Sequence, residues 1–172
     1  MAITRLNHAV LYVRDAERSA DFYQSVLGFR VVNQLPGAYF LQASGSTNEH
    51  DLGLFSIGNG AGPTNAGRSE VGLYHLAWEV DTLDELRRIA DALRDAGALV
   101  GASDHSTTKA LYAKDPDGIE FEVSWLVPAD RLDDAIIAGR SRLAPLDIDA
   151  EIDRFGGSTR GGVGISSAAS PS

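Results

Sequence analysis

The chain of 172 residues contains no cysteine and only four histidines, and both facts limit its chemistry. Without thiols it forms no disulfide, no thiolate nucleophile and no cysteine-ligated zinc or iron–sulfur site. Any metal must therefore be bound by nitrogen and oxygen. No apolar run approaches the roughly 18 residues that span a bilayer, and the start lacks the regions of a signal peptide. We therefore expect a cytoplasmic protein that binds no membrane.

Basic residues are also scarce, since 15 lysines and arginines stand against 24 acidic residues and the formal net charge is −9. A net negative charge disfavours binding to nucleic acid or to anionic lipid. We therefore expect a small-molecule ligand. With 44% hydrophobic residues, the chain is long enough to bury one substantial core, which predicts a single domain.

A pattern of strand, helix and three strands occurs twice along the chain. The first copy covers about residues 5–57, with a helix that Asp15 caps and Gly28 ends. The second covers about residues 72–126, where Asp81 is the expected N-cap and apolar residues recur at helical spacing. The sequence thus predicts an α+β fold of two βαβββ modules.

The segments outside the modules differ in composition. A Gly-, Pro- and Asn-rich stretch between the modules predicts a loop. After the second module, two short helical patterns are separated by Pro145, and a Gly- and Ser-rich end follows. We predict a domain over residues 1–127, a helical extension over 128–155 and a flexible tail over 156–172. We expect no catalytic residue beyond the domain.

His8 and His75 each lie in a strand-like stretch of apolar residues, at equivalent positions of the two modules. A lone strand histidine is more often a hydrogen-bonded core residue than a ligand, but two at equivalent positions favour metal binding. A carboxylate from the strand-like GIEFEVSW would complete a two-histidine, one-carboxylate set, which suits Fe(II). Alternation places Glu120 and Glu122 on the same strand face, so both stay open at this point.

Four segments carry a family resemblance: LNHAVLYV, EHDLGLF, GLYHLAWEV and DHSTTKALYAKDPDGIEFEV. Through them the chain resembles the vicinal oxygen chelate superfamily over about residues 5–126. Within that superfamily it is most similar to the single-domain type I extradiol ring-cleavage dioxygenases, which are like catechol 2,3-dioxygenase. The resemblance implies one domain with a curved mixed sheet around a metal site, and a homodimer, since dimers are common in the family.

The resemblance also implies roles for individual residues. The implied metal ligands are His8, His75 and Glu122. The implied metal is Fe(II), with Mn(II) accepted by the same donors. The implied catalytic residues around the metal are His50, His105 and Tyr112. The implied reaction cleaves a catechol-like aromatic diol with O2, with His50 as acid and base and the other two residues positioning the substrate.

One position separates the dioxygenase interpretation from a glyoxalase one. Glyoxalase I usually takes a fourth protein ligand, a glutamate, from the first module. The ligand histidine and glutamate of the second module lie 47 residues apart. The same offset from His8 leads to Phe55, next to Leu54, and neither side chain binds a metal. Glu49 and Asp51 are close in sequence and remain alternatives.

Three classes of function fit these observations. An extradiol dioxygenase is favoured. The second class is a non-oxidative metal-dependent enzyme of the superfamily: a lyase, an isomerase or a thiol-transferase resistance protein. The third, a metal-free drug-binding protein, leaves the histidines and the glutamate unexplained. From the residues alone, Tyr112 also suits a core phenol, and His50 and His105, beside acidic residues, also suit exposed loops.

Overall fold

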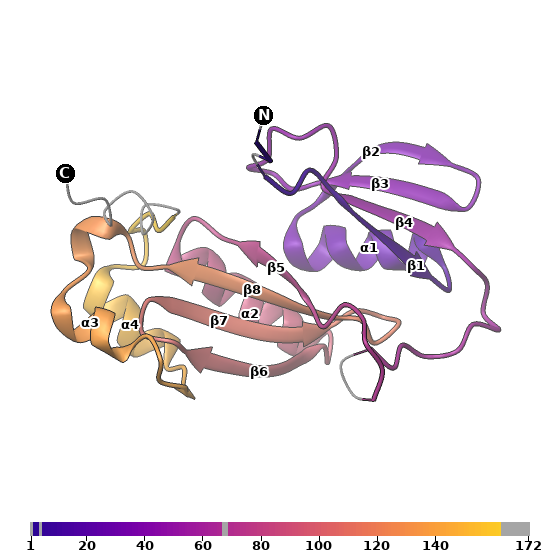
Figure 1. Ribbon diagram of the computed structural model, residues 1–172. Coiled ribbons are helices and arrows are strands. Elements are labelled where there is room, and N and C mark those ends of the chain that lie inside the picture. The colour runs from indigo at the N-terminus through magenta and orange to yellow at the C-terminus, as the bar shows by residue number, and fades with distance from the viewer. Residues whose placement is uncertain (1, 4, 67–68, 163–172) are drawn as a thin grey trace. The chain divides into compact units, whose positions relative to one another are not determined.

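The computed structural model describes residues 2–3, 5–66 and 69–162. The chain divides into two compact units. Unit 1 comprises Met1–Ser69 and Asp115–Ile119, and unit 2 comprises Glu70–Lys114 and Glu120–Ser172. Each unit contains one βαβββ module with its own mixed sheet (Figure 1), which confirms the α+β fold and the duplication predicted from the sequence.

Unit 1 consists of a four-stranded sheet and one helix. Its elements are, in order, β1 (Ala9–Val13), α1 (Ala16–Leu27), β2 (Arg30–Leu35), β3 (Ala38–Gln42) and β4 (Leu52–Ser56). The strand order is β1-β4-β3-β2, with β1 parallel to β4 and the other pairs antiparallel. Helix α1 packs against β3 and β4.

The ends of α1 follow the sequence prediction. The Asp15 carboxylate accepts hydrogen bonds from the backbone N–H groups of Glu17 and Arg18, at 3.0 and 3.2 Å, and so satisfies donors that have no partner inside the helix. Gly28 ends the helix with φ 70°, a left-handed conformation that glycine adopts without steric cost.

Unit 2 repeats the pattern with β5 (Leu76–Glu79), α2 (Leu83–Asp95), β6 (Leu99–Asp104), β7 (Thr108–Lys114) and β8 (Glu120–Leu126). Here β5 is parallel to β8, and β8 pairs with β7 and β7 with β6, both antiparallel. The expected N-cap Asp81 is wrong by one residue. Thr82 is the cap, because its hydroxyl accepts the N–H of Glu85 at 3.2 Å.

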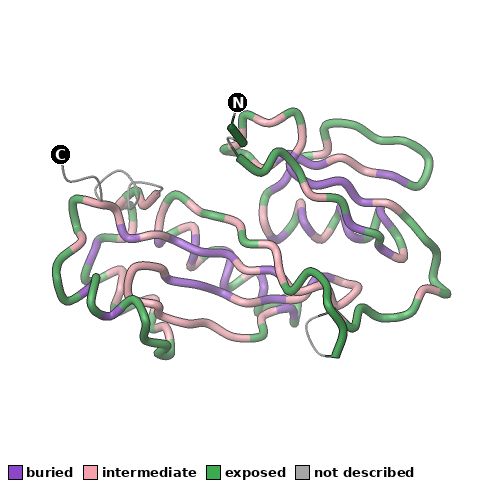
Figure 2. Tube along the Cα trace, in the orientation of Figure 1, coloured by how far each residue is buried: buried purple, intermediate pink, exposed green. Residues whose placement is uncertain are grey.

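Side chains along the two central strands of unit 2 point alternately to the two faces of the sheet. One face is more deeply buried than the other, except at the paired Ala110 and Ser124, which are buried as well. The fully buried side chains Lys109, Leu111, Phe121 and Trp125 alternate with half-buried ones that include Tyr112 and Glu122. Figure 2 shows the buried stretches of these strands. Helix α2 packs against β7 and β8. The half-buried side chains therefore lie on the face of the sheet that α2 does not cover.

The chain continues through η1 (Ala129–Arg131), α3 (Asp134–Gly139), β9 (Ala144–Pro145) and α4 (Ile148–Phe155). Strand β9 pairs with the end of β6. In the expected flexible tail, Gly161 and Gly162 donate backbone hydrogen bonds to Asp81 and Leu126, at 2.8 and 3.3 Å. The rest of that tail, from residue 163, lies outside the described residues. No helix among the described residues is both long and apolar enough to cross a bilayer.

The DPDG segment, residues 115–118, forms a turn with Gly118 at φ 83°. Its carboxylates make contacts within unit 1. Asp117 accepts the Arg14 backbone N–H and pairs with the Arg14 guanidinium, both at 2.7 Å. The buried hydroxyl of Tyr23 donates to Asp115 at 3.4 Å. Burial, and then the charge of Asp115, raises the pKa of Tyr23 well above its usual value, so this phenol stays protonated.

Candidate metal and substrate site

Unit 2 brings two of the three predicted metal ligands together. His75 immediately precedes β5, and Glu122 lies in β8, which pairs in parallel with β5. Ala77, two residues after His75, is the ladder partner of Glu122, so the three side chains share one face of the sheet. His75 Nε2 lies 3.3 Å from Glu122 Oε2.

The surroundings of His75 fit a metal ligand. Its Nδ1 atom is buried and has no hydrogen-bond partner among the described residues, while Nε2 faces the carboxylate. A buried polar nitrogen without a partner is unfavourable and rare in folded proteins. Imidazole nitrogen and carboxylate oxygen are donors that Fe(II) and Mn(II) accept. The pair therefore fits a divalent transition metal.

Glu120, the competing carboxylate on the same strand, has a different environment. It pairs with Lys114 at 3.5 Å, and its side chain is 35% exposed, against 14% for Glu122. A carboxylate that is balanced by an ammonium near solvent has no need of a metal. The geometry of unit 2 thus favours Glu122.

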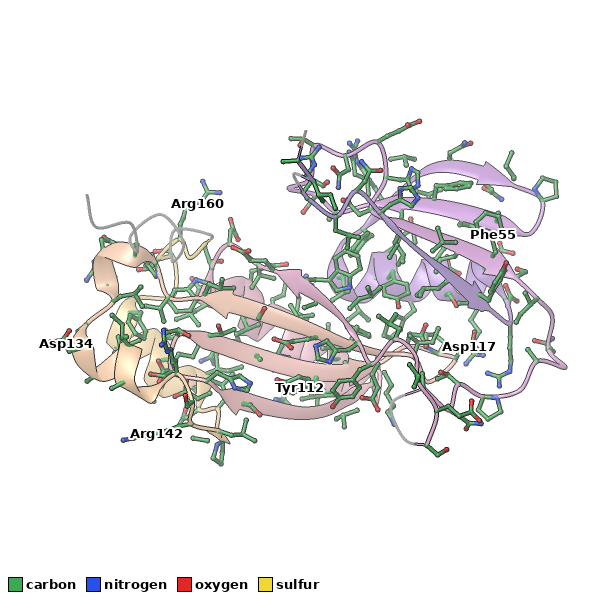
Figure 3. All side chains as sticks on the ribbon, viewed as in Figure 1. Phe55, Tyr112, Asp117, Asp134, Arg142 and Arg160 are labelled. Atoms are coloured by element: carbon green, nitrogen blue, oxygen red, sulfur yellow. The ribbon has the colours of Figure 1, made fainter. Side chains whose placement is uncertain are left out.

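Two predicted catalytic residues meet beside this pair. Tyr112 on β7, labelled in Figure 3, lies directly opposite Glu122 in the β7–β8 ladder. Its hydroxyl is 2.9 Å from Nε2 of His105, and its ring centroid is 6.1 Å from that of His75. Burial raises the pKa of Tyr112, and the charge of Glu122 raises it further. The phenol therefore stays neutral, and its proton is available to another acceptor in the tautomer in which His105 Nε2–H donates to the Tyr112 oxygen.

A small cavity adjoins these residues within unit 2. It has a volume of about 190 Å³ and is lined in part by His75, Tyr112 and three further residues, Tyr74, Gly101 and Phe121. Aromatic rings around a few polar groups are typical of pockets for small organic ligands. The cavity is large enough for a single aromatic ring.

Unit 1 holds the other two predicted site residues. His8 precedes β1 and His50 lies shortly before β4, and their ring centroids are 4.5 Å apart. His8 is exposed, with Nδ1 2.8 Å from the side-chain oxygen of Asn7. The ring of Phe40 lies edge-on to His50, with centroids 5.2 Å apart. Both histidines lie in segments outside the strands, and their rings contact each other.

The described residues of either unit contain no group of three or more His, Asp or Glu side chains that holds a metal by itself. Unit 2 joins His75, Glu122, Tyr112 and His105, and unit 1 joins His8 and His50. The predicted set is thus divided between two clusters. The third ligand, His8, stays a prediction.

The register corrects the position that would carry a fourth ligand. In unit 2, Glu122 pairs with the residue two positions after the ligand histidine. The residue at that place in unit 1 is Gly53, which pairs with Val10. The expected equivalent, Phe55, is wrong by two residues. The paired residues Gly101 and Tyr112 of β6 and β7 are 11 residues apart, whereas Asn33 and Phe40 of β2 and β3 are only seven apart, and the shorter β7–β8 segment offsets only part of this difference. A glycine offers no ligand, so the position remains empty of carboxylate.

The two neighbouring carboxylates do not replace it. Asp51 is buried and its oxygens accept three hydrogen bonds of 2.7–2.8 Å from Ala43, Ser46 and Asn48. These bonds hold the loop before β4 and use the lone pairs that a metal would need. Glu49 is exposed. Unit 1 therefore shows no counterpart of Glu122.

Sequence reasoning missed four lining residues of the cavity, Val100, Gly101, Ala113 and Phe121. Gly101 follows a β-bulge between Leu99 and Gly101 and lies opposite Tyr112, and an added Cβ there would meet nothing within 4 Å. The signal was a glycine inside the strand-like ALVGAS, which marks a bulge or a close approach. Trp125, an aromatic residue of the same sheet, is fully buried in the core and does not line the cavity.

Residues 5–123 match the family model described as Glyoxalase/Bleomycin resistance protein/Dioxygenase superfamily. The chain belongs to this superfamily. It is 33% identical over 120 residues to catechol-2,3-dioxygenase of Bacillus subtilis, covering 70% of this chain and 41% of the relative. The chain therefore spans less than half the length of that relative.

Two further relatives match this chain over a larger share of their own length. Biphenyl-2,3-diol 1,2-dioxygenase 3 of Rhodococcus globerulus is 32% identical, over 77% of this chain and 71% of the relative. Lactoylglutathione lyase of Neisseria meningitidis serogroup A is 30% identical, over 69% of this chain and 88% of the relative. The relatives thus include both oxidative and non-oxidative enzymes.

A solved structure of a glyoxylase/bleomycin resistance protein/dioxygenase domain from Frankia sp. EAN1pec has the same fold. Its TM-score is 0.58 at 21% sequence identity, and the match covers 72% of this chain and 92% of that chain. At this identity the similarity establishes only the fold of this chain.

Proposed function

We propose that the protein is a non-haem Fe(II)-dependent extradiol dioxygenase that cleaves a catechol-like aromatic diol with O2. The observation that carries this proposal is the hydrogen bond between His105 and Tyr112 beside Glu122. A neutral phenol held in place by an imidazole is suited to donate a hydrogen bond to a substrate oxygen that becomes negatively charged. The His75 and Glu122 pair lies on the same face and supplies the metal donors.

His75 and Glu122 would hold the metal, and His8 is the proposed third ligand. Bound there, Fe(II) supplies a cation that lowers the pKa of a diol hydroxyl and an electron source for O2. Mn(II) accepts the same donors. A set of three protein ligands would allow the metal to bind a bidentate substrate and oxygen as well.

The protein's own residues would bind and orient the diol and move its protons. Tyr112 keeps its proton because burial raises its pKa, and it would donate to one diol oxygen. His105, at 2.9 Å, orients the phenol. His50 would exchange the proton that the reaction releases, as a general acid and base. The aromatic walls of the 190 Å³ cavity would hold the ring.

A second candidate is a non-oxidative, metal-dependent lyase or isomerase. The observation that favours it is the match to a lactoylglutathione lyase over 88% of that relative's length. Such a reaction would use the same metal donors without O2. The lack of a carboxylate at Gly53 argues against it.

The test is oxygen uptake by protein reconstituted anaerobically with Fe(II) and given a panel of mono- and polycyclic catechols, with visible spectra of the products. We expect O2 consumption and a new absorbance from ring-opened product. The same protein, loaded with Fe(II) or Mn(II), is also given a hemithioacetal. Isomerisation of that substrate without any O2 uptake would favour the lyase and overturn the dioxygenase proposal.

A further inference from the structure

The hairpin that carries His105 is held in an unusual conformation. It joins β6 to β7, and its Ser106 has φ 67°, the only positive φ of a non-glycine residue among those described. Side chains rarely adopt this region, and such residues persist only where their surroundings hold them. The Asp104 carboxylate accepts the Ser106 N–H at 2.7 Å, and the His105 N–H donates to Thr108 O at 2.9 Å.

Helix α3 of the C-terminal extension contacts the tip of this hairpin. The Ser106 hydroxyl donates to the backbone oxygen of Ile136 at 2.8 Å. Gly139 lies so close that an added Cβ would be 2.6 Å from Ser106 Oγ and 3.0 Å from its Cβ. Only a glycine fits at that approach. The extension therefore fixes the residue next to His105 by a bond and by close packing.

Strand β9 and helix α4 hold the base of the same hairpin. In the β6–β9 ladder, Asp104 pairs with Ala144. Lys109, which is fully buried, places its ammonium 2.5 Å from Asp104 and 3.1 Å from Glu151 of α4. A buried lysine is unfavourable unless anions compensate its charge. Glu151 therefore completes the charge balance around the carboxylate that binds Ser106.

We propose that the C-terminal extension is a positioning element for His105, and that Glu151 and Ser106 are the positioning residues through which it acts. This inference rests on the proposed function for its catalytic consequence only. Among the described residues, the ion pair of Glu151 goes to Lys109 and the hydrogen bonds of Ser106 go to Asp104 and Ile136, and none of these goes to the metal donors or to Tyr112. They set where the imidazole meets the phenol.

The test compares two variants of the same helix. Glu151→Gln removes the second anion of Lys109. Asp149→Asn, two residues away, removes only an exposed pair with Arg87 and is the matched control. The ring signals of the four histidines are followed by NMR in the full-length protein without added metal, with His105 assigned from a His105→Gln variant. We expect Glu151→Gln to shift or broaden the His105 signal and Asp149→Asn to leave it unchanged.

A Ser106→Gly variant covers the case in which Glu151→Gln fails to fold. Glycine adopts a positive φ without strain, so the fold should persist. The variant lacks the hydroxyl bond to α3, so the His105 signal should change. With Fe(II) and a diol, kcat should fall roughly tenfold for either positioning variant at unchanged iron content, since small misplacements of catalytic groups are costly. An unaltered His105 signal in a folded variant overturns the inference. Lack of O2 uptake by the wild type overturns only the dioxygenase proposal.

Discussion

The two units share a backbone pattern and differ in the side chains along matching rows of their sheets. Each row starts two residues after the histidine that opens its module, His8 or His75, and follows the paired residues across four strands of the sheet. The row of unit 1 is Val10, Gly53, Phe40 and Asn33. The row of unit 2 is Ala77, Glu122, Tyr112 and Gly101. Both rows end just after a register shift, between Val31 and Asn33 or between Leu99 and Gly101.

The two rows have equivalent backbone positions and differ in two side chains that matter for chemistry. Where unit 2 has a carboxylate and a phenol, unit 1 has a hydrogen atom and a phenyl ring. Unit 1 keeps a histidine at the start, His8, and adds His50 beside it. A duplicated backbone thus positions polar groups in one copy and leaves an apolar surface in the other, so the chemistry depends on single residues and not on the fold.

The strongest test of this comparison removes the carboxylate that only unit 2 has. In Glu122→Ala, metal content after dialysis and O2 uptake should both fall by about 100-fold or more, since even loss of a group that supports a ligand costs about 10- to 100-fold. Glu120→Gln is the control, because Glu120 is paired with Lys114. If the control loses as much iron, the assignment of the ligand moves to Glu120.

The histidines of the two units should separate into ligands and a proton carrier. His8→Ala and His75→Ala should both lose iron, whereas His50→Ala should retain it and lose roughly 100-fold in kcat, the usual contribution of an acid–base group. Iron is measured by atomic absorption and turnover by an oxygen electrode. Equal iron loss in all three variants would make His50 a ligand.

Tyr112→Phe makes the row of unit 2 resemble that of unit 1. The variant loses one hydrogen bond to substrate, which should lower kcat by about tenfold at unchanged iron content. Because the pKa of Tyr112 is raised, the wild type should keep its activity to a pH above about 10, the usual tyrosine value. Steady-state rates as a function of pH check both points, and full activity of the variant would reduce Tyr112 to packing.

Gly101→Val fills the end of the row in unit 2. An added Cβ at Gly101 meets nothing within 4 Å, so the fold should tolerate the change while the cavity becomes smaller. We expect kcat/KM for a fused-ring diol to fall about tenfold relative to that for catechol, the scale of a steric change of one or two carbons in a pocket. Equal changes for both diols would place the ring elsewhere.

The smallest effect concerns Asp115, in the turn that belongs to unit 1. Burial raises the pKa of this carboxyl, so the folded protein holds its proton more tightly than the unfolded chain. That stability is present below the unfolded pKa of about 3.9 and is lost as pH rises through the folded pKa. An Asp115→Asn variant has no carboxyl proton to lose, so its stability should not fall for this reason. In urea unfolding, the free energy of wild type relative to the variant should decline over that window, and a parallel pH dependence contradicts the assignment.

Much of the fold was predictable because its signals are local. Asp15 and Gly28 mark the ends of α1, the apolar spacing marks the buried face of α2, and alternation marks the strands. The superfamily resemblance also extended over nearly the segment that the family model matches. Such features depend on neighbours a few residues apart, which a sequence displays directly.

The errors and omissions have both local and long-range causes. The cap of α2 fell on Thr82 instead of Asp81, since either residue suits the position. The offset that led to Phe55 failed because the hairpin that joins β6 to β7 is longer than the one that joins β2 to β3. In the sequence, Lys109 resembles an ordinary surface lysine. Its burial depends on Glu151 of α4, which is 42 residues further along the chain. Pairings of that kind follow from tertiary structure and leave no local pattern.

The turn between β7 and β8 has a consequence for any attempt to divide the molecule. It is encoded within the second module, yet its residues Asp115–Ile119 belong to unit 1, where Asp117 binds Arg14 and Asp115 accepts from Tyr23. A gene split in the connection after residue 57 would produce an N-terminal fragment that lacks both carboxylates. Its Arg14 would have lost its anion and its Tyr23 its acceptor. The chain is duplicated in pattern, but no single cut yields two self-sufficient halves.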